Sequence, residues 1–233
     1  MFFENAIAGA GFAAIVMVAT AAIAGRLLPS PATHSAMQHL AAGMICAVVA
    51  AELVPKAMQT GRGMELGLGF VAGFVLMLSA KVVAGRLTGG ASSAGMLIAV
   101  GLDIAIDGLL IGIAFAIGTD TGGLFVLAFT MEFIAVGLVV GARGEQKPSR
   151  SIWTAAILAA PVVPAAAAGQ SLLSSMSLGL EAGLMGFAAS ICLYLVIEEL
   201  MREAHKVTEH PLANWLFFAG FLGLVLLQMQ LTH

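Results

Sequence analysis

The sequence predicts an all-α integral membrane protein, and three observations support this fold class. Of the 233 residues, 60% are apolar and 10% are charged, and the mean hydropathy is +1.02. The apolar residues form runs of about 20, which is the length that a helix needs to cross a bilayer. These runs are continuously apolar, whereas the strands of a membrane barrel alternate in polarity. We therefore expect transmembrane helices in a single domain over residues 1–233.

The charge balance and the cysteines exclude several other classes of protein. Ten Lys and Arg stand against thirteen Asp and Glu, without a polybasic segment, which argues against a nucleic-acid partner. Cys46 and Cys192 lie inside apolar runs, where a thiol is more often a packing group than half of a disulfide. The chain is therefore neither disordered nor a disulfide-stapled secreted domain.

Turn-forming residues divide the apolar sequence into eight spans. The breaks fall at Pro29/Pro31, Gly61/Gly63, Gly89-Gly90, Gly122-Gly123, Pro148 and Pro211. The first span is alanine-rich like a secretory signal, but Glu4 and the lack of Lys or Arg before it favour a membrane span. We place the spans at residues 5–25, 36–55, 64–85, 94–117, 122–142, 151–174, 178–201 and 212–231.

The orientation follows from the cations, because loops rich in Lys and Arg stay in the cytoplasm. The connections after spans one, three, five and seven hold eight of the ten: Arg26, Lys81, Arg86, Arg143, Lys147, Arg150, Arg202 and Lys206. The other side holds Lys56 and Arg62. Both termini are therefore predicted to lie outside the cell, and the composition suggests a bacterial inner membrane.

The second and seventh spans end in similar sequences. Residues 45–57 carry Cys46 and then Glu52-Leu53, and residues 191–204 carry Cys192 and then Glu199-Leu200. Because the two segments lie five spans apart, they cross the membrane in opposite directions, as in the inverted repeats of secondary transporters. Spans one to three and six to eight would form the repeats, with spans four and five as a central pair.

Three acidic residues lie in this central pair. Asp103 and Asp107 are one helical turn apart and share a face of the fourth span. A short turn over residues 118–123 folds the fifth span back, so that Asp107 and Glu132 both lie roughly 15 Å from the outer surface. We expect the three carboxylates and the thioether of Met131 to meet near the middle of the bilayer.

Acidic groups at this depth need compensation. A charged side chain at the centre of a spanning helix costs about 2.5 to 3.5 kcal/mol, so three carboxylates would cost roughly 8 to 10 kcal/mol. Neither span contains Lys, Arg or His. A bound cation, protons or water in a cavity must therefore neutralise the carboxylates.

The two central spans carry sequences that resemble the motifs of a known protein family. Residues 103–108 read Asp-Ile-Ala-Ile-Asp-Gly, and residues 131–136 read Met-Glu-Phe-Ile-Ala-Val. These residues resemble the His-Asn-x-x-Asp/Glu-Gly and His-Glu-x-x-Glu-Gly motifs of the ZIP (Zrt/Irt-like) family of divalent metal transporters. Spans two and seven are similar to family segments that end in His-Leu-x-Pro-Glu-Ala and Glu-Leu-x-Pro-Glu. The resemblance covers essentially the whole chain and implies a 3+2+3 arrangement of eight spans with both termini outside.

Several positions depart from the family pattern. Ile104 replaces an Asn, Ala135 replaces a carboxylate, and Val163 stands where the sixth span often has Glu. Because these side chains have no donor atom for a metal, the resemblance implies a reduced centre with one ion. Its ligands would be Asp103, Asp107, Glu132 and Met131. A site without imidazole or thiolate should bind zinc more weakly and less selectively.

Other potential ligands lie near the membrane boundaries. Four acidic residues are either solvated helix ends or ligands that a metal meets on its way in or out: Glu52, Glu198, Glu199 and Glu203. The histidines in or beside loops do not form a cluster: His34, His39, His205 and His210. The connection over residues 85–95 has no His, so regulation through a His-rich loop is not expected.

The leading hypothesis is import of zinc or a similar divalent ion (Fe, Mn, Co or Cd), by rocking of two repeat-derived bundles around the site. The alternative is a transporter of the same fold that moves a non-metal cargo with proton-coupled carboxylates. An enzyme is not expected, because aspartyl intramembrane proteases take their Asp residues from two helices and the His-Glu-x-x-His motif is absent. We expect no cofactor besides the transported ion, and the glycine faces of spans four and five leave a homodimer open.

Overall fold

Helices make up the regular structure of the described chain. The computed structural model describes residues 3–27, 30–88, 93–142, 148–171, 177–205 and 213–231. In chain order the elements are α1 (Ala6–Leu27), α2 (Pro31–Ala47), η1 (Val48–Leu53), α3 (Val54–Gln59), α4 (Gly63–Thr88), α5 (Ser93–Ile117), α6 (Thr119–Gly141), α7 (Pro148–Ala159), α8 (Val162–Ser171), α9 (Leu178–Leu195), η2 (Val196–Met201), α10 (Arg202–Ala204) and α11 (Ala213–Leu231). Each predicted span coincides with one of these elements or with a run of adjacent ones.

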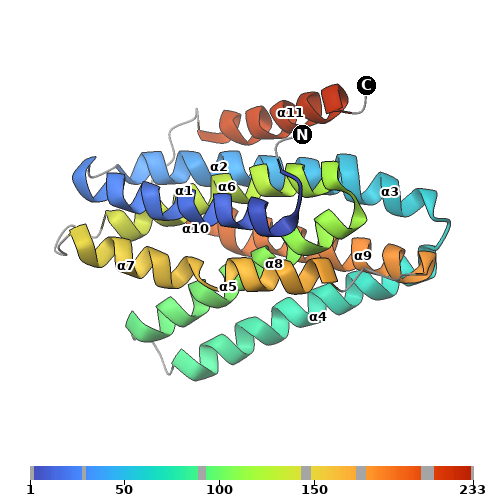
Figure 1. Ribbon diagram of the computed structural model, residues 1–233, viewed down its shortest axis with the longest axis horizontal. Helices are drawn as coiled ribbons and strands as arrows, with labels where there is room; N and C mark the ends of the chain where they lie inside the picture. Colours follow the sequence, from blue (N-terminus) through green and yellow to red (C-terminus); the bar gives the residue numbers. More distant parts are fainter. Residues whose placement is uncertain are drawn as a thin grey trace.

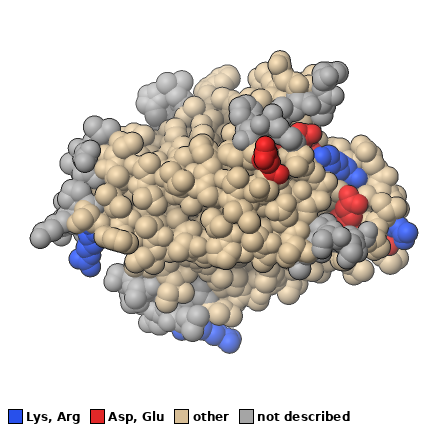
Figure 2. Space-filling view, in the orientation of Figure 1, with Lys and Arg blue, Asp and Glu red and all other residues tan. Residues whose placement is uncertain are grey.

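The lengths and the surface of these helices fit a membrane. Within the described ranges, seven helical runs are long and apolar enough to cross a bilayer, and α11 is a shorter apolar helix at the eighth predicted position. Large apolar side chains are exposed along α4, among them Leu68, Phe74 and Val83. Charged residues are sparse on the face that Figure 2 shows. The architecture is that of an all-helical, multi-pass membrane protein, as the composition predicts.

The sixth predicted span is interrupted near its middle. Pro161 has no N–H to donate, and its ring crowds the carbonyl four residues earlier. As a result α7 ends at Ala159 and α8 begins at Val162. The unbroken span expected over 151–174 is therefore two helices, and residues 172–174 fall outside the described residues.

The second and seventh spans share an irregularity near their acidic ends. Each changes there from α-helix to π-helix, in η1 and in η2. η1 contains Glu52, and η2 contains Glu198 and Glu199. A π-helical turn accommodates an extra residue and is frequent at functional sites. When the two similar sequences are aligned on their Glu-Leu pairs, η1 and η2 overlap, and η2 begins one residue later than η1.

Four helix pairs make the most extensive contacts (Figure 1). They are α1 with α6, α5 with α8, α2 with α11, and α4 with α9. An inverted repeat relates spans one, two, three and four to spans six, seven, eight and five, respectively. Under this exchange the α1–α6 pair becomes the α8–α5 pair. The α2–α11 pair becomes the α9–α4 pair in the same way. This is the pattern of packing that an inverted repeat predicts.

The helices group into two bundles. The first bundle contains α1, α5, α6, α7 and α8, and the second contains α2, η1, α3, α4, α9, η2, α10 and α11. The bundles meet chiefly where α2 lies against α6. Each bundle takes helices from both predicted repeats, because the closest contacts join members of different repeats or a repeat with the central pair. The two bundles are therefore not the two repeats themselves, because each combines helices of both.

The glycine faces of the central pair are used inside the chain. A Cβ on Gly112 would lie 2.2 Å from the carbonyl oxygen of Ala166 in α8. A Cβ on Gly141 would lie 2.4 Å from the carbonyl oxygen of Ala21 in α1. Such contacts between backbones hold α5 and α6 within the first bundle. They account for these faces without a second copy of the chain.

Candidate metal centre

The structure brings the three acidic residues of the central pair together. Asp103 and Asp107 project from α5, and Glu132 projects from α6. One carboxylate oxygen of each lies within 4.8 Å of the other two. Asp107 is 0% exposed and Glu132 is 3% exposed. The predicted convergence of these carboxylates is therefore confirmed.

Local structure explains why they meet. Asp103 and Asp107 share a face because they are one turn apart in an unbroken helix. α5 and α6 are joined through Gly118, whose N–H donates to the carbonyl of Ala114 and whose carbonyl accepts from the N–H of Gly122. This tight connection makes the two helices antiparallel neighbours, which places Glu132 at the level of the aspartates.

Three carboxylate oxygens at this site have no partner among the described residues. Within the described region, both oxygens of Asp107 and the Oε2 atom of Glu132 are buried without a hydrogen-bond partner. A buried charged oxygen without a donor is costly, and a proton or a cation removes that cost. Three ion pairs of the described residues lie elsewhere: Lys56 with Glu52, Arg62 with Glu65, and Lys81 with Glu198.

Two cavities reach the carboxylates along the boundary between the bundles. The larger has a volume of about 310 Å³ and is lined by Asp103 and Glu132 of the first bundle and by Gln38, Glu199 and Glu203 of the second. Both lie toward the beginning of α5, where Arg202 lines both cavities and Lys81 lines the smaller one.

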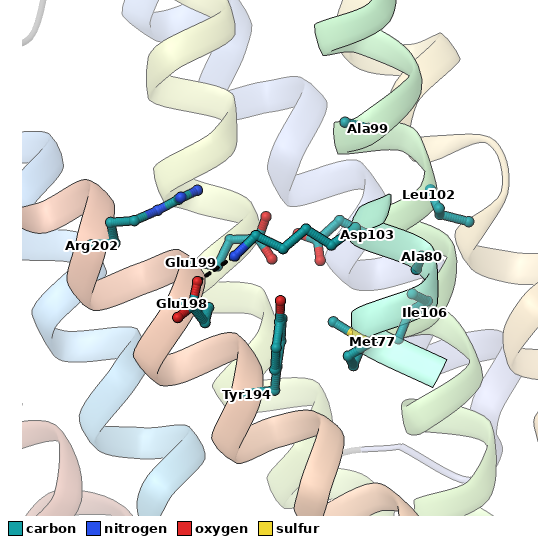
Figure 3. A pocket seen from close by; sticks show the side chains of 11 residues that line it. Met77, Ala80, Ala99, Leu102, Asp103, Ile106, Tyr194, Glu198, Glu199 and Arg202 are labelled. Carbon is teal, nitrogen blue, oxygen red and sulfur yellow. Dashed lines mark hydrogen bonds and ion pairs between the residues drawn. The ribbon is translucent and has the colours of Figure 1, made fainter. Parts of the chain in front are cut away.

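The smaller cavity lies between α4, α5 and the seventh span. It has a volume of about 200 Å³. Figure 3 shows Asp103 and Ile106 on one side of this cavity, with Tyr194, Glu198 and Glu199 opposite. Asp103 is thus reached from two directions.

The four expected pathway residues have different surroundings. Glu199 is exposed and lines both cavities together with Asp103. Glu198 forms an ion pair with Lys81 instead. Glu203 lines the larger cavity. Glu52 is 2% exposed and lies outside both cavities.

Met131 does not share the position of its neighbour Glu132. Successive residues of a helix point about 100° apart. Met131 is half-buried against the apolar core and lines neither cavity. The expected contribution of its thioether stays a prediction.

Gln38 is a polar residue that the sequence analysis did not single out. It is 5% exposed, lines the larger cavity, and its Oε1 atom is buried without a partner in the described region. The sequence signal for it is an amide beside His39 in a largely apolar second span. Its oxygen offers a neutral ligand, or an acceptor for metal-bound water, next to the carboxylates.

The histidines that the sequence offers as potential ligands have different surroundings. His39 is fully buried, and its Nδ1 atom bonds the carbonyl oxygen of Ser35 at 2.9 Å. Its ring lies 5.7 Å from that of His205, measured between centroids. His34 lines the larger cavity, whereas His210 lies outside the described residues.

The positions that depart from the ZIP pattern supply no ligand. Ile104 is 1% exposed and Ala135 is 2% exposed, and both belong to the apolar interior. A site of carboxylate oxygens with a nearby amide suits hard and borderline divalent cations. Comparisons with models of protein families and with curated proteins find no match to this chain. The ZIP resemblance therefore rests on the residues quoted above.

Proposed function

We propose that this protein transports a divalent transition-metal ion across the membrane through a site made by Asp103, Asp107 and Glu132. The supporting observation is the meeting of three acidic side chains at mid-helix, with oxygens of Asp107 and Glu132 buried and unpartnered. A cation of charge two offsets most of this charge while it is bound. A cavity of about 310 Å³ gives the ion a way to leave.

The dimensions suit one small ion. Two oxygens that bind the same zinc ion at about 2.1 Å in tetrahedral geometry lie roughly 3.4 Å apart. The three oxygens here lie within 4.8 Å of one another, so a contraction of the order of 1 Å would complete the site. Zinc, iron, manganese and cobalt fit the oxygen ligands, whereas the softer cadmium ion would depend more on the Met131 thioether.

The transport cycle would move the two bundles relative to one another. The three carboxylates belong to the first bundle, whereas Gln38, Glu199 and Glu203 face them from the second. Rocking at this boundary would expose the carboxylates to each side of the membrane in turn. With both termini outside, as the cations and the ZIP resemblance predict, the cavities open to the cytoplasm and the ion is released there. An inner bacterial membrane fits this orientation.

A second candidate is transport of a non-metal cargo with proton-coupled carboxylates. The unpartnered oxygens of Asp107 and Glu132 favour it as well, because a proton removes the cost of a buried carboxylate just as a cation does. Titration calorimetry with zinc, cadmium and manganese separates the candidates. Metal binding that disappears with the carboxylates supports the first, and no binding of any of these ions supports the second.

The decisive structural experiment is a crystal soaked with cadmium or zinc and measured at the metal absorption edge. We expect one anomalous peak between α5 and α6, in contact with Asp107 and Glu132. Two peaks would show that the centre binds two ions and is not reduced to one. No peak in a crystal that diffracts well would overturn the metal site.

Metal binding should weaken as the pH falls. Carboxylates bind metal only when they are deprotonated, so protons compete with the ion for the same oxygens. The expected result is a metal-induced rise in melting temperature that is largest near neutral pH and shrinks steadily in acid. A rise that is constant across the same pH series would contradict binding through Asp103, Asp107 and Glu132.

The adjacent residues Glu199 and Glu198 provide a matched test of the pathway. Glu199→Gln should slow metal uptake into proteoliposomes severalfold, because this side chain lines both cavities together with Asp103. Glu198→Gln should change uptake little. It breaks a half-exposed ion pair with Lys81 that contributes about 0 to 1 kcal/mol to the stability of the protein. Equal effects of the two substitutions would show that Glu199 has no special place in the pathway.

A further inference from the structure

A polar contact joins the two bundles at the end of α6 that is far from the cavities. Thr121, in the first turn of α6, is fully buried, and its hydroxyl donates to the Oε2 atom of Glu52 at 3.3 Å. The ammonium of Lys56 lies 2.7 Å from the same carboxylate oxygen and also donates to the Thr121 hydroxyl. Thr121 belongs to the first bundle, whereas Glu52 in η1 and Lys56 in α3 belong to the second.

Large apolar side chains lie between this contact and the carboxylates. Glu132 lies eleven residues after Thr121 in the same helix, which corresponds to about 16 Å. Phe125 and Phe129 occupy the intervening turns of α6, each 1% exposed, with ring centroids 5.9 Å apart. Leu53, next to Glu52, is fully buried. The carboxylates are therefore sealed on this side, although the cavities reach them from the other.

The exposure of the ion pair suits a contact that opens. The side chain of Glu52 is 3% exposed, whereas that of Lys56 is 37% exposed. The Lys56 ammonium therefore stays near water on a flexible stem, while the carboxylate is held inside. When the bundles are together, the Thr121 hydroxyl contacts both members of the pair. When they separate, these two contacts break, whereas the ion pair stays within the second bundle and water hydrates its charges.

We propose that Glu52, Lys56 and Thr121 form a lock that holds the outer side of the transport pathway closed and opens once in each cycle. This proposal rests on the proposed transport function and identifies the contact that controls access from outside. Lys56 acts as a tethered cation: its ammonium fills the position at Glu52 that an arriving metal ion would otherwise meet first. Sequence alone presents Glu52 as a pathway ligand, whereas here its partner is supplied by the chain itself.

The test measures access and needs no metal. Ala128 is 1% exposed and shares a helical face with Thr121 and Glu132. The reporter is Ala128→Cys in a protein that also carries Cys46→Ala and Cys192→Ala. A membrane-impermeant maleimide is added outside intact cells, and the rate of labelling is measured.

Thr121→Val should raise the labelling rate about tenfold, because losing the bridging hydroxyl shifts the population toward the open state. The double substitution Glu52→Gln with Lys56→Gln should do the same without leaving a charge unpaired. The matched control is Thr130→Val, whose hydroxyl bonds the carbonyl oxygen of Val126 within α6 at 2.6 Å. Its labelling rate should equal that of the parent.

Two results would overturn the lock. One is a labelling rate that neither lock variant raises above that of Thr130→Val. The other is a parent protein that is already labelled as fast as the lock variants. If the lock variants raise the labelling rate but the protein takes up no metal, the result would support the lock and count against a metal ion as the cargo. If the protein takes up metal but the lock variants leave the labelling rate unchanged, the result would support the metal cargo and overturn the lock.

Discussion

Asp107→Asn is expected to abolish metal-dependent uptake into proteoliposomes. Asp107 is fully buried and both of its oxygens lack a partner in the described region, so a bound ion is the group that would satisfy them. Asparagine keeps the shape but loses the charge and one acceptor. Loss of a direct ligand should weaken binding by more than the about 10- to 100-fold that loss of an outer-shell partner costs. Calorimetry and uptake measure this effect separately.

The same substitution should stabilise the metal-free protein. Removing a buried charge with unsatisfied oxygens relieves a cost of about 1 to 3 kcal/mol or more. Asp107→Asn should therefore melt at a higher temperature than the parent without metal, and it should gain nothing when metal is added. A binding site that is costly when empty commonly shows this exchange of stability for function.

Asp120→Asn is the matched control, because Asp120 is an exposed acid in the first turn of α6. It should leave both uptake and melting temperature unchanged. Undiminished uptake by Asp107→Asn would overturn the proposed site. A lower melting temperature for the metal-free variant would mean that Asp107 has a structural role instead.

Gly69→Ala is expected to prevent stable folding. A Cβ at this position in α4 would lie 1.8 Å from the carbonyl oxygen of Gly183 and 2.9 Å from its Cα atom in α9. Both are backbone atoms, so relief requires one whole helix to shift. Overpacking of this kind should cost about 3 kcal/mol or more. The expected readout in detergent is a large drop in melting temperature or a loss of the monodisperse protein.

Gly67→Ala is the control in the same helix. A Cβ there meets nothing within 4 Å, and alanine is favoured over glycine in a helix by about 1 kcal/mol. Gly67→Ala should therefore be neutral or slightly stabilising. Equal behaviour of the two variants would show that α4 does not pack on α9 as closely as described.

The spans could be predicted because their cause is local. About 20 apolar residues in a row need no partner to be recognised as a membrane helix, and turn residues mark the ends. The start of α2 shows the limit of this reasoning. The helix begins at Pro31, five residues before the expected span, because the Ser30 hydroxyl accepts from the N–H of Thr33 at 3.2 Å and caps it. A cap followed by polar residues is not visible to a hydropathy pattern.

The candidate site was partly predictable for the same reason. The spacing of Asp103 and Asp107 fixes their common face, and the short turn before α6 fixes the depth of Glu132. The roles of Glu198 and Glu199 were not predictable, because η2 is π-helical and the rotation of its side chains differs from that of an α-helix. In the structure Glu199 lines both cavities together with Asp103, whereas Glu198 pairs with Lys81.

The sequence by itself determined that this chain is a bundle of membrane helices with three acidic side chains meeting deep inside it. Those features follow from hydropathy, helical periodicity and a short connection, which act over a few residues. The tertiary structure decided how the helices group into two bundles, which cavity Gln38 lines and how Thr121 comes to bridge Glu52 and Lys56. These depend on close packing between residues far apart in the chain, and periodicity within one helix carries no information about which neighbour its face will meet.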